Sequence, residues 1–152
     1  MSLLRPGPTG VALAAGLLAG APAGAAGREI RVLGRGDAGA MAFEPALLRV
    51  APGDTVCSLA AHRGHDAESL AMMAPEGTPL LRGRSNEEIA VTFGKPGVHG
   101  YQCKPHHGLG MVGLVLVGDG AEAKGNLEQA RAARHPARPR ERLEQMFNEF
   151  GG

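Results

Sequence analysis

Aromatic residues are scarce in this sequence, which has no tryptophan, one tyrosine and four phenylalanines, or 3% aromatic residues in all. Basic charge is not in excess either, because 16 lysines and arginines stand against 15 aspartates and glutamates. Composition therefore does not favour nucleic-acid binding. Cysteine occurs only as Cys57 and Cys103, which excludes a small scaffold held together by many disulfides. A length of 152 residues excludes a large multidomain enzyme and fits one compact domain.

Glycine and hydrophobic residues are plentiful by contrast. Hydrophobic residues make up 43% of the chain and charged residues 20%, so a buried core is expected and wholesale disorder is not. There are 24 glycines and 11 prolines. These residues favour turns and interrupt helices, so the composition favours a turn-rich chain over a long helical bundle.

Residues 1–26 are predicted to be a secretory signal peptide. Arg5 precedes an apolar stretch at 11–18, and small residues with an Ala-x-Ala pattern follow. The stretch is shorter than a membrane-spanning helix needs, and Pro22 interrupts it. An uncleaved anchor or a disordered Ala/Gly tail remain as alternatives. Cleavage would leave a mature chain with no membrane-inserted segment, exported to an oxidising compartment.

The middle of the chain is predicted to consist of short strands separated by turns. Pro-Gly turns and short runs rich in Val, Ile and Phe recur along it, a pattern typical of an antiparallel β-sandwich. Residues 61–87 are expected to form loops, with one short helical turn near 72–73 or 80–81. The expected strands cover residues 29–33, 46–50, 55–60, 89–93, 98–103 and 112–117.

The composition changes after Gly118, where Ala, Glu and Arg dominate. Helices are predicted at 126–134 and 139–150, separated by Pro136. In the second helix, residues at helical spacing form one apolar face, namely Leu143, Met146, Phe147 and Phe150. We therefore expect a domain at 27–118 and a helical extension at 119–152 that packs on it. A membrane-binding helix is disfavoured because acidic and basic side chains balance in this segment.

One cluster of residues points to metal chemistry. Cys103, His106 and Met111 follow the spacing C-x2-H-x4-M between two predicted strands, and His65 supplies a second imidazole from another loop. A thiolate, two imidazoles and a weak thioether are the ligands of a blue-copper electron-transfer site. Two alternatives remain. One is a Cys57–Cys103 disulfide, the default for two cysteines in an exported chain. The other is a zinc site, for which methionine is a poor ligand.

These motifs resemble the pseudoazurins, which are type 1 copper proteins of the cupredoxin fold. The similarity runs from about Glu29 to the C-terminus, and its marks lie at 41–46, 50–56, 64–69, 103–113 and 117–119. The resemblance implies a mainly β fold, namely an antiparallel or mixed Greek-key β-sandwich with two C-terminal α-helices. It also implies that one copper ion is bound by four ligands, His65, Cys103, His106 and Met111.

The same resemblance implies a function. It predicts a soluble one-electron carrier of the periplasm that is monomeric and meets its redox partners transiently. The partners would be a reductase such as copper nitrite reductase and a cytochrome-type donor or acceptor. An enzyme is not expected, because a closed copper site leaves no open position for a substrate. The alternatives are a periplasmic copper-trafficking protein, whose metal would be labile, and a structural module with the Cys57–Cys103 bridge.

The resemblance also implies an electron port at the edge of His106. Residues expected at the surface around it are Met41, Ala42, Pro105, Gly108 and Leu109. A basic rim that steers an acidic partner is expected from Arg35, Arg63, Arg82, Arg84 and Lys104.

Several positions depart from the family's pattern, among them Cys57 and Ser58, which stand where Thr-Phe is usual. Asp66 stands where asparagine is usual; it lacks the amide donor that ties the two ligand loops, and its negative charge is predicted to lower the reduction potential. Cys57 is expected to be a small buried residue. His107 is expected at the surface and not as a fifth ligand.

Overall fold

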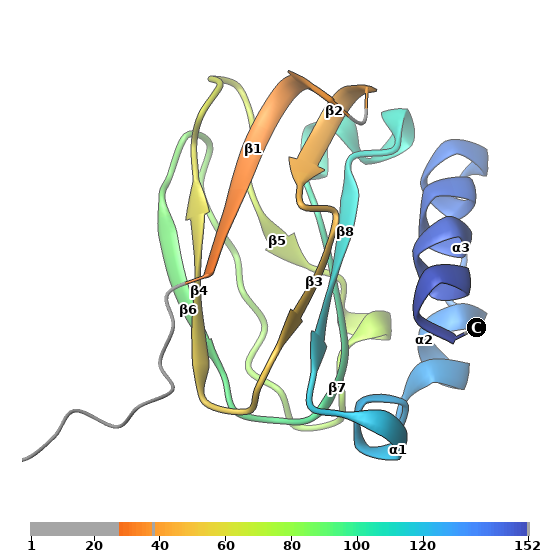
Figure 1. Ribbon diagram of the computed structural model, residues 1–152. Coiled ribbons are helices and arrows are strands. Elements are labelled where there is room, and N and C mark those ends of the chain that lie inside the picture. The colour runs from red at the N-terminus through yellow and green to blue at the C-terminus, as the bar shows by residue number, and fades with distance from the viewer. Residues whose placement is uncertain (1–27, 38, 152) are drawn as a thin grey trace, which may run out of the picture.

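The computed structural model describes residues 28–37 and 39–151, so the predicted signal peptide at 1–26 lies outside the described residues. The chain folds into a sandwich of two four-stranded sheets (Figure 1). The first sheet has the order β2-β1-β4-β6, with β1 Arg28–Gly36, β2 Gly39–Glu44, β4 Asp54–Leu59 and β6 Ile89–Phe93. The second has the order β3-β8-β7-β5, with β3 Leu47–Val50, β5 Glu68–Ser69, β7 Gly97–Gln102 and β8 Val112–Val117.

Both sheets are mixed. β1 pairs with β4 and β3 pairs with β8 in parallel, while the other neighbours are antiparallel. The mainly β cupredoxin-type sandwich is confirmed, and its sheets have the mixed form of the antiparallel or mixed arrangement that was expected. Two strands, β2 and β5, were not predicted. β2 reads Gly-Ala-Met-Ala-Phe-Glu, which has little β propensity, and Met41 within it has a left-handed φ of 52°.

Four helical segments, η1, α1, α2 and α3, contact the second sheet, and a fifth, η2, lies in the connection between β7 and β8. Their bounds are η1 Ala71–Met73 and η2 Lys104–Leu109, both 3₁₀ helices, and α1 Gly120–Ala123, α2 Leu127–Ala132 and α3 Ala137–Gly151. The two predicted C-terminal helices correspond to α2 and α3, and a turn of helix was expected at η1; α1 was not predicted. No helix within the described residues has the length and apolar character needed to cross a membrane.

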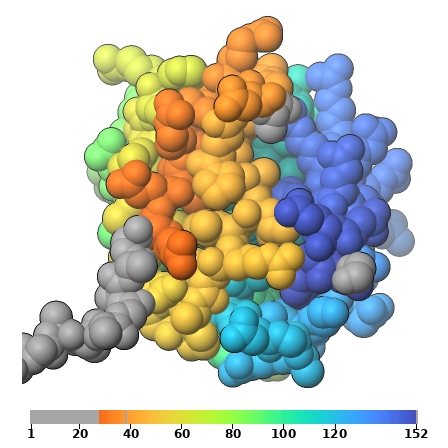
Figure 2. Space-filling view, viewed as in Figure 1, coloured from red at the N-terminus to blue at the C-terminus, as the bar shows by residue number. Residues whose placement is uncertain are grey.

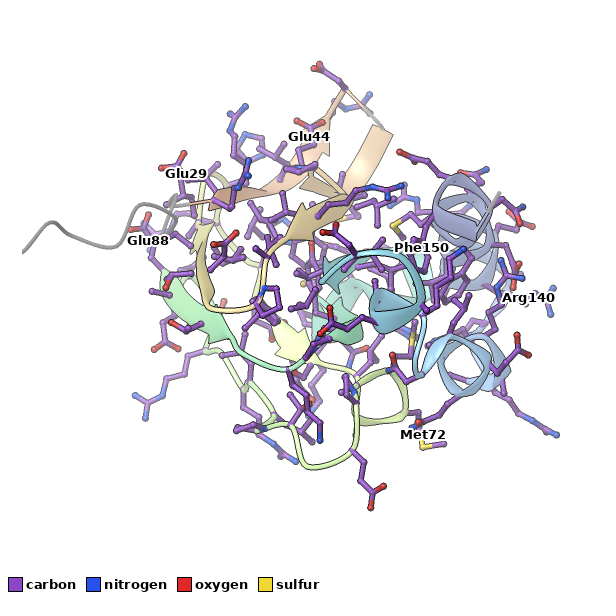
Figure 3. The ribbon with its side chains drawn as sticks, turned by 60° about the horizontal axis from the view of Figure 1, so that its bottom comes forward. Glu29, Glu44, Met72, Glu88, Arg140 and Phe150 are labelled. Atoms are coloured by element: carbon purple, nitrogen blue, oxygen red, sulfur yellow. The ribbon has the colours of Figure 1, made fainter. Side chains whose placement is uncertain are left out.

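α3 packs on β8 through its apolar face. The buried side chains of that face are Leu143, Met146, Phe147 and Phe150, and they share one core cluster with Leu114 and Leu116 of β8. Figure 3 shows Phe150 on the side of α3 that faces the sandwich and Arg140 on the outer side. Figure 2 shows the blue α3 and the orange and yellow strands forming one continuous surface. The helical extension therefore completes the cover of the second sheet.

A second core cluster lies between the two sheets. Phe43 of β2 and Tyr101 of β7 meet edge to face with ring centroids 4.7 Å apart. Cys103 and Met111, at the two ends of the connection from β7 to β8, belong to the same cluster, and neither is exposed at all. The sandwich core thus extends directly into the residues that the sequence marks for metal chemistry.

Acid is expected to destabilise the fold through His99 of β7. This side chain is 6% exposed, and its Nε2–H donates to the carbonyl of Lys95 at 2.8 Å. Burial lowers the pKa of His99 below its ordinary value of 6.5, and this hydrogen bond opposes the effect only in part. At a pH between the two pKa values, His99 is therefore protonated in the unfolded chain and neutral in the folded chain. The free energy of unfolding should fall as the pH drops below 6.5, until the folded-state pKa is passed.

Urea unfolding of the protein and of His99→Gln between pH 7 and pH 5 checks this expectation. Glutamine keeps a donor for the Lys95 carbonyl but does not titrate, so the stability of the variant should fall less on acidification. Parallel curves for the two proteins would show that His99 contributes nothing to the acid sensitivity.

Candidate metal centre

The segment between β7 and β8 is built as a closed loop. Cys103 follows β7, η2 carries His106, and Met111 stands directly before β8. The Cys103 N–H donates to the Met111 carbonyl at 3.0 Å, and the Met111 N–H donates to the His106 carbonyl at 3.3 Å. Gly110 ends the 3₁₀ helix with a φ of 91°, a left-handed conformation that glycine adopts without strain. The main chain therefore fixes the spacing of these three residues.

His65 comes from the long connection after β4, and Asn86 contacts its segment through one side-chain and one backbone hydrogen bond. Asn86 accepts the Gly64 N–H at its Oδ1 (2.7 Å), and its own N–H donates to the His65 carbonyl (2.8 Å). Sequence reasoning missed Asn86, which lay in a region expected to be loop. Its φ of 63° is a conformation that asparagine tolerates, so an asparagine in a turn was the only available signal.

Asp66 ties the two ligand-bearing segments together. Its Oδ1 accepts the Lys104 N–H at 2.7 Å, across the space between the His65 segment and η2. The expectation that a carboxylate lacks a donor is correct chemically, but the tie between the loops does not need that donor. An acceptor at position 66 is sufficient, because the partner is a backbone N–H.

Three side chains converge on one point. The Nδ1 atoms of His65 and His106 lie 3.0 Å apart, and the Cys103 Sγ lies 3.4 Å from the His106 Nδ1 and 3.7 Å from the His65 Nδ1. Ligand atoms that share one ion at about 2.0–2.3 Å have separations of this size. Within the described residues this is the only cluster of three or more His, Cys, Asp or Glu side chains suited to a metal ion.

Burial favours the uncharged forms of two members of the cluster, His65 and Cys103. His65 is 5% exposed and Cys103 is fully buried. Desolvation, and then the neighbouring His106 and His62, lower the pKa of His65 below 6.5, while Asp66 opposes this shift. Desolvation raises the pKa of the Cys103 thiol above 9.0. Neutral imidazole is ready to bind a metal ion, whereas the thiol must lose its proton to do so.

Met111 lies beside this cluster in the core. It is fully buried, shares the core cluster of Cys103, and is joined to Cys103 by a backbone hydrogen bond. The donor set available at this point therefore combines a soft thiol with two imidazoles, next to a buried thioether. That chemistry fits copper better than zinc.

The remaining sequence expectations have mixed outcomes. His107 turns away from the cluster toward His135, with its Nε2 3.1 Å from the His135 Nδ1, and it is half-buried rather than at the surface. Cys57 is a free, half-buried thiol and not a buried one, and Cys103 is free as well, so no disulfide joins them. Ala42 was expected at the surface but is only 4% exposed, because β2 turns it into the sandwich.

Of the other residues expected at the surface near His106, Met41 is half-buried and packs against the core, whereas three are exposed. Leu109 is 45% exposed, and Pro105 and Gly108 are exposed too. All five basic residues proposed for the rim are exposed, namely Arg35, Arg63, Arg82, Arg84 and Lys104.

Arg142 of α3 is a further residue that the sequence did not reveal. Its Nη1 donates to the carbonyls of Met41 and Gly110, both at 2.7 Å, and its Nη2 donates to the carbonyl of Ala40 at 2.8 Å. One guanidinium thus joins the C-terminal helix to β2 and to the residue that precedes Met111.

A mixed β-sandwich that places a cysteine and a histidine of one loop against a histidine from another segment defines a cupredoxin. Comparison with known proteins agrees. The family described as copper binding proteins, plastocyanin/azurin family, matches residues 30–118. The chain is 42% identical over 134 residues to a pseudoazurin of Paracoccus pantotrophus, covering 88% of this chain and 90% of that one.

A second curated relative and a solved structure extend this comparison. The chain is 39% identical to a pseudoazurin of Methylorubrum extorquens over 126 residues, with 83% of each protein covered. The refined crystal structure of pseudoazurin from Methylobacterium extorquens superposes with a TM-score of 0.78 at 37% identity, covering 82% of this chain and 99% of that one. The chain belongs to the plastocyanin/azurin family of copper-binding proteins and, within it, to the pseudoazurins. Its cofactor is copper.

Asp66→Asn is expected to raise the reduction potential of the copper-loaded protein by tens of millivolts. The oxidised site carries one more positive charge than the reduced site, so a nearby carboxylate favours the oxidised state. Asparagine keeps an oxygen for the Lys104 N–H and removes only the charge. Voltammetry measures the shift. Glu68→Gln, on the neighbouring β5, is the control and should shift the potential less. An unchanged or lower potential in Asp66→Asn would refute the charge effect.

Proposed function

We propose that this protein is a soluble one-electron carrier of the periplasm with a type 1 copper site. His65, Cys103, His106 and Met111 would hold the ion, which supplies the chemistry by exchanging one electron between its two oxidation states. The observation that carries the proposal is the convergence of one thiol and two imidazole nitrogens with separations of 3.0–3.7 Å.

The role of the polypeptide is to fix the positions of the ligands and to exclude water from them. The backbone hydrogen bonds between Cys103, His106 and Met111, and the Asn86 contacts around His65, fix the main chain from which the ligand side chains extend. Burial of Cys103 and His65 excludes water from the site. A site that is formed in advance changes little when its charge changes, and a small rearrangement favours fast electron exchange.

His106 is the proposed exit point for the electron. It is half-buried, in contrast to the buried His65, and the exposed residues Pro105, Gly108 and Leu109 lie on the same short helix. A small apolar patch of this kind suits brief docking, and the exposed basic residues would steer an acidic partner toward it. The partners we propose are a periplasmic reductase, such as copper nitrite reductase, and a cytochrome-type protein.

The remaining features of the proposal concern organisation. Residues 1–26 would direct export and be removed. Residues 27–118 would form the copper-binding domain, and residues 119–152 would form an extension whose Arg142 supports the ligand loop. The protein would act as a monomer and not as an enzyme, because four ligands leave no position open for a substrate.

Copper titration followed by redox cycling tests the function. The purified mature chain should bind one Cu(II) per chain with an intense thiolate-to-copper absorption. The copper should stay bound through repeated reduction and reoxidation in the presence of a chelator. Rapid loss of the metal to the chelator would favour a trafficking protein, and a protein that binds no copper would exclude both copper functions.

A further inference from the structure

A second pair of histidines lies beside the metal centre, outside the cluster of proposed copper ligands. His107 is on η2, directly after His106, and His135 stands two residues before α3. The His107 Nε2 and the His135 Nδ1 are 3.1 Å apart, and both side chains are half-buried. The two residues are 28 positions apart in the chain, so this contact joins the ligand loop to the C-terminal extension.

The geometry of this pair is that of a hydrogen bond and not that of two ligands sharing an ion. In the ligand pair, the His65 and His106 Nδ1 atoms are 3.0 Å apart and the ring centroids 4.7 Å. The nitrogens of His107 and His135 are almost equally close, but their ring centroids are 5.3 Å apart. The rings of His107 and His135 therefore point these nitrogens at each other, whereas nitrogens that share an ion turn toward it.

The chemical state of the two rings suits one hydrogen bond. Desolvation lowers the pKa of both His107 and His135 below 6.5, and His107 adds to the effect on His135. A neutral imidazole has one N–H and one bare nitrogen, so one ring donates and the other accepts. The other nitrogen of His135, Nε2, is buried and has no partner among the described residues. The bond to His107 is thus the polar contact that fixes the orientation of the His135 ring.

His107 passes this contact to the ligand loop through the backbone of η2. Its carbonyl accepts the Gly110 N–H at 2.9 Å, and the carbonyl of His106 accepts the Met111 N–H at 3.3 Å. Arg142 binds the same turn through the Gly110 carbonyl. The C-terminal extension therefore contacts the ligand loop at two points, one through a guanidinium and one through an imidazole.

The ring of His106 has no hydrogen bond, within the described residues, to a group outside the cluster of His65, Cys103 and His106. Its position therefore depends on the backbone of η2. We propose that His135 is a positioning residue for the copper site, because its hydrogen bond to His107 holds η2, and with it His106, in the place that binds the ion. This inference rests on the proposed function, in which His106 is a copper ligand.

His135→Leu tests the inference in the copper-free and the copper-loaded protein. Leucine keeps much of the bulk of the side chain but removes the hydrogen bond to His107. In the copper-free protein, amide hydrogen exchange at Gly110 and Met111 should become about fivefold faster, as expected for the loss of one ordinary hydrogen bond. In the copper-loaded protein, the absorption maximum should shift and the Cu(I) affinity should fall by about tenfold, as when other residues that orient a metal ligand are replaced.

Two further variants separate the hydrogen bond from the bulk of the side chain. His135→Asn places a polar atom where the Nδ1 of histidine lies, so it should restore the exchange rates, the Cu(I) affinity and the spectrum. Gln129→Leu changes another neutral polar residue to leucine at an exposed position of α2, and it should leave all three unchanged.

The outcomes distinguish this inference from the proposed function. An unmodified protein that binds no copper would overturn both. If the unmodified protein binds copper, the positioning role alone fails when His135→Leu leaves hydrogen exchange, affinity and spectrum unchanged. It fails as well when His135→Asn behaves like His135→Leu, because the bulk of the ring and not its hydrogen bond would then be responsible.

Discussion

Replacing Arg142 with methionine is expected to lower the free energy of unfolding by about 3 kcal/mol, because hydrogen bonds from charged donors are each worth about 1.5–3 kcal/mol and water restores part of the loss. Methionine keeps the apolar stem of the side chain but removes the guanidinium hydrogen bonds to the carbonyls of Ala40, Met41 and Gly110. Of these carbonyls, that of Gly110 still accepts the Val112 N–H. The melting temperature should fall by about 10 °C for a domain of this size. Arg142→Lys keeps the charge, but a single ammonium group cannot bind the carbonyls through two nitrogens at once. Its loss of stability should therefore be intermediate.

The same variant should change the copper site, which separates positioning from simple stabilisation. The Gly110 carbonyl belongs to the peptide that leads into Met111, so loosening it shifts the thioether relative to Cys103 and His106. Met111 is the proposed fourth ligand, and a weak ligand of this kind tunes a type 1 site, so the visible spectrum and the reduction potential should both change.

Arg140→Met is the matched control for this prediction. Arg140 is exposed on the outer side of α3 (Figure 3), so stability and spectrum should remain close to those of the unmodified protein. An Arg142→Met protein that loses stability while its spectrum and potential stay unchanged would show that the arginine only fastens the helix.

The residues of the site that lie close together in the sequence were predicted, whereas the residues that hold the site from remote parts of the chain were not. Cys103, His106 and Met111 lie on one short loop, so their spacing alone predicted that they would meet. Asn86 and Arg142 each act through backbone groups far away in the chain. A polar residue in a loop or on a helix surface looks the same whether it faces water or supports a ligand loop. Such roles become visible only when the fold brings the partners together.

The fold shows the same division between local and non-local information. The strands with clear hydrophobic patterns and turn signals were predicted, as was α3 with its apolar face. β2 was missed because its pairing with β1, and not its composition, makes it a strand. The parallel pairs β1–β4 and β3–β8 were not predicted either, because the sequence of one strand does not indicate which distant strand it pairs with or in which direction.

Replacing Cys103 with serine is expected to abolish the intense visible absorption of the copper-loaded protein and to weaken Cu(I) binding by about 100-fold or more, because a soft thiolate is replaced by a hard hydroxyl. The Cys103 Sγ lies 3.4 Å and 3.7 Å from the two imidazole nitrogens. Cys103 supplies the one thiol in the cluster of His65, Cys103 and His106, so the variant has no thiolate ligand there. Serine has nearly the same shape and sits where the backbone is held by Met111, so the fold should persist. Absorption spectroscopy and competition with a Cu(I) chelator measure the two effects.

Cys57→Ser provides the matched control, because it makes the same substitution at the only other thiol of the chain. Cys57 lies half-buried on β4 and takes no part in the cluster of His65, Cys103 and His106. Its variant should keep both the colour and the affinity. Loss of colour in both variants would instead mean that the two sulfurs act together, and colour retained in Cys103→Ser would exclude the thiolate as the source of the absorption.

The burial of Cys103, which raises the pKa of its thiol, also predicts that copper loading releases one proton from this residue. That proton should be absent when Cys103→Ser is titrated with copper in a weakly buffered solution.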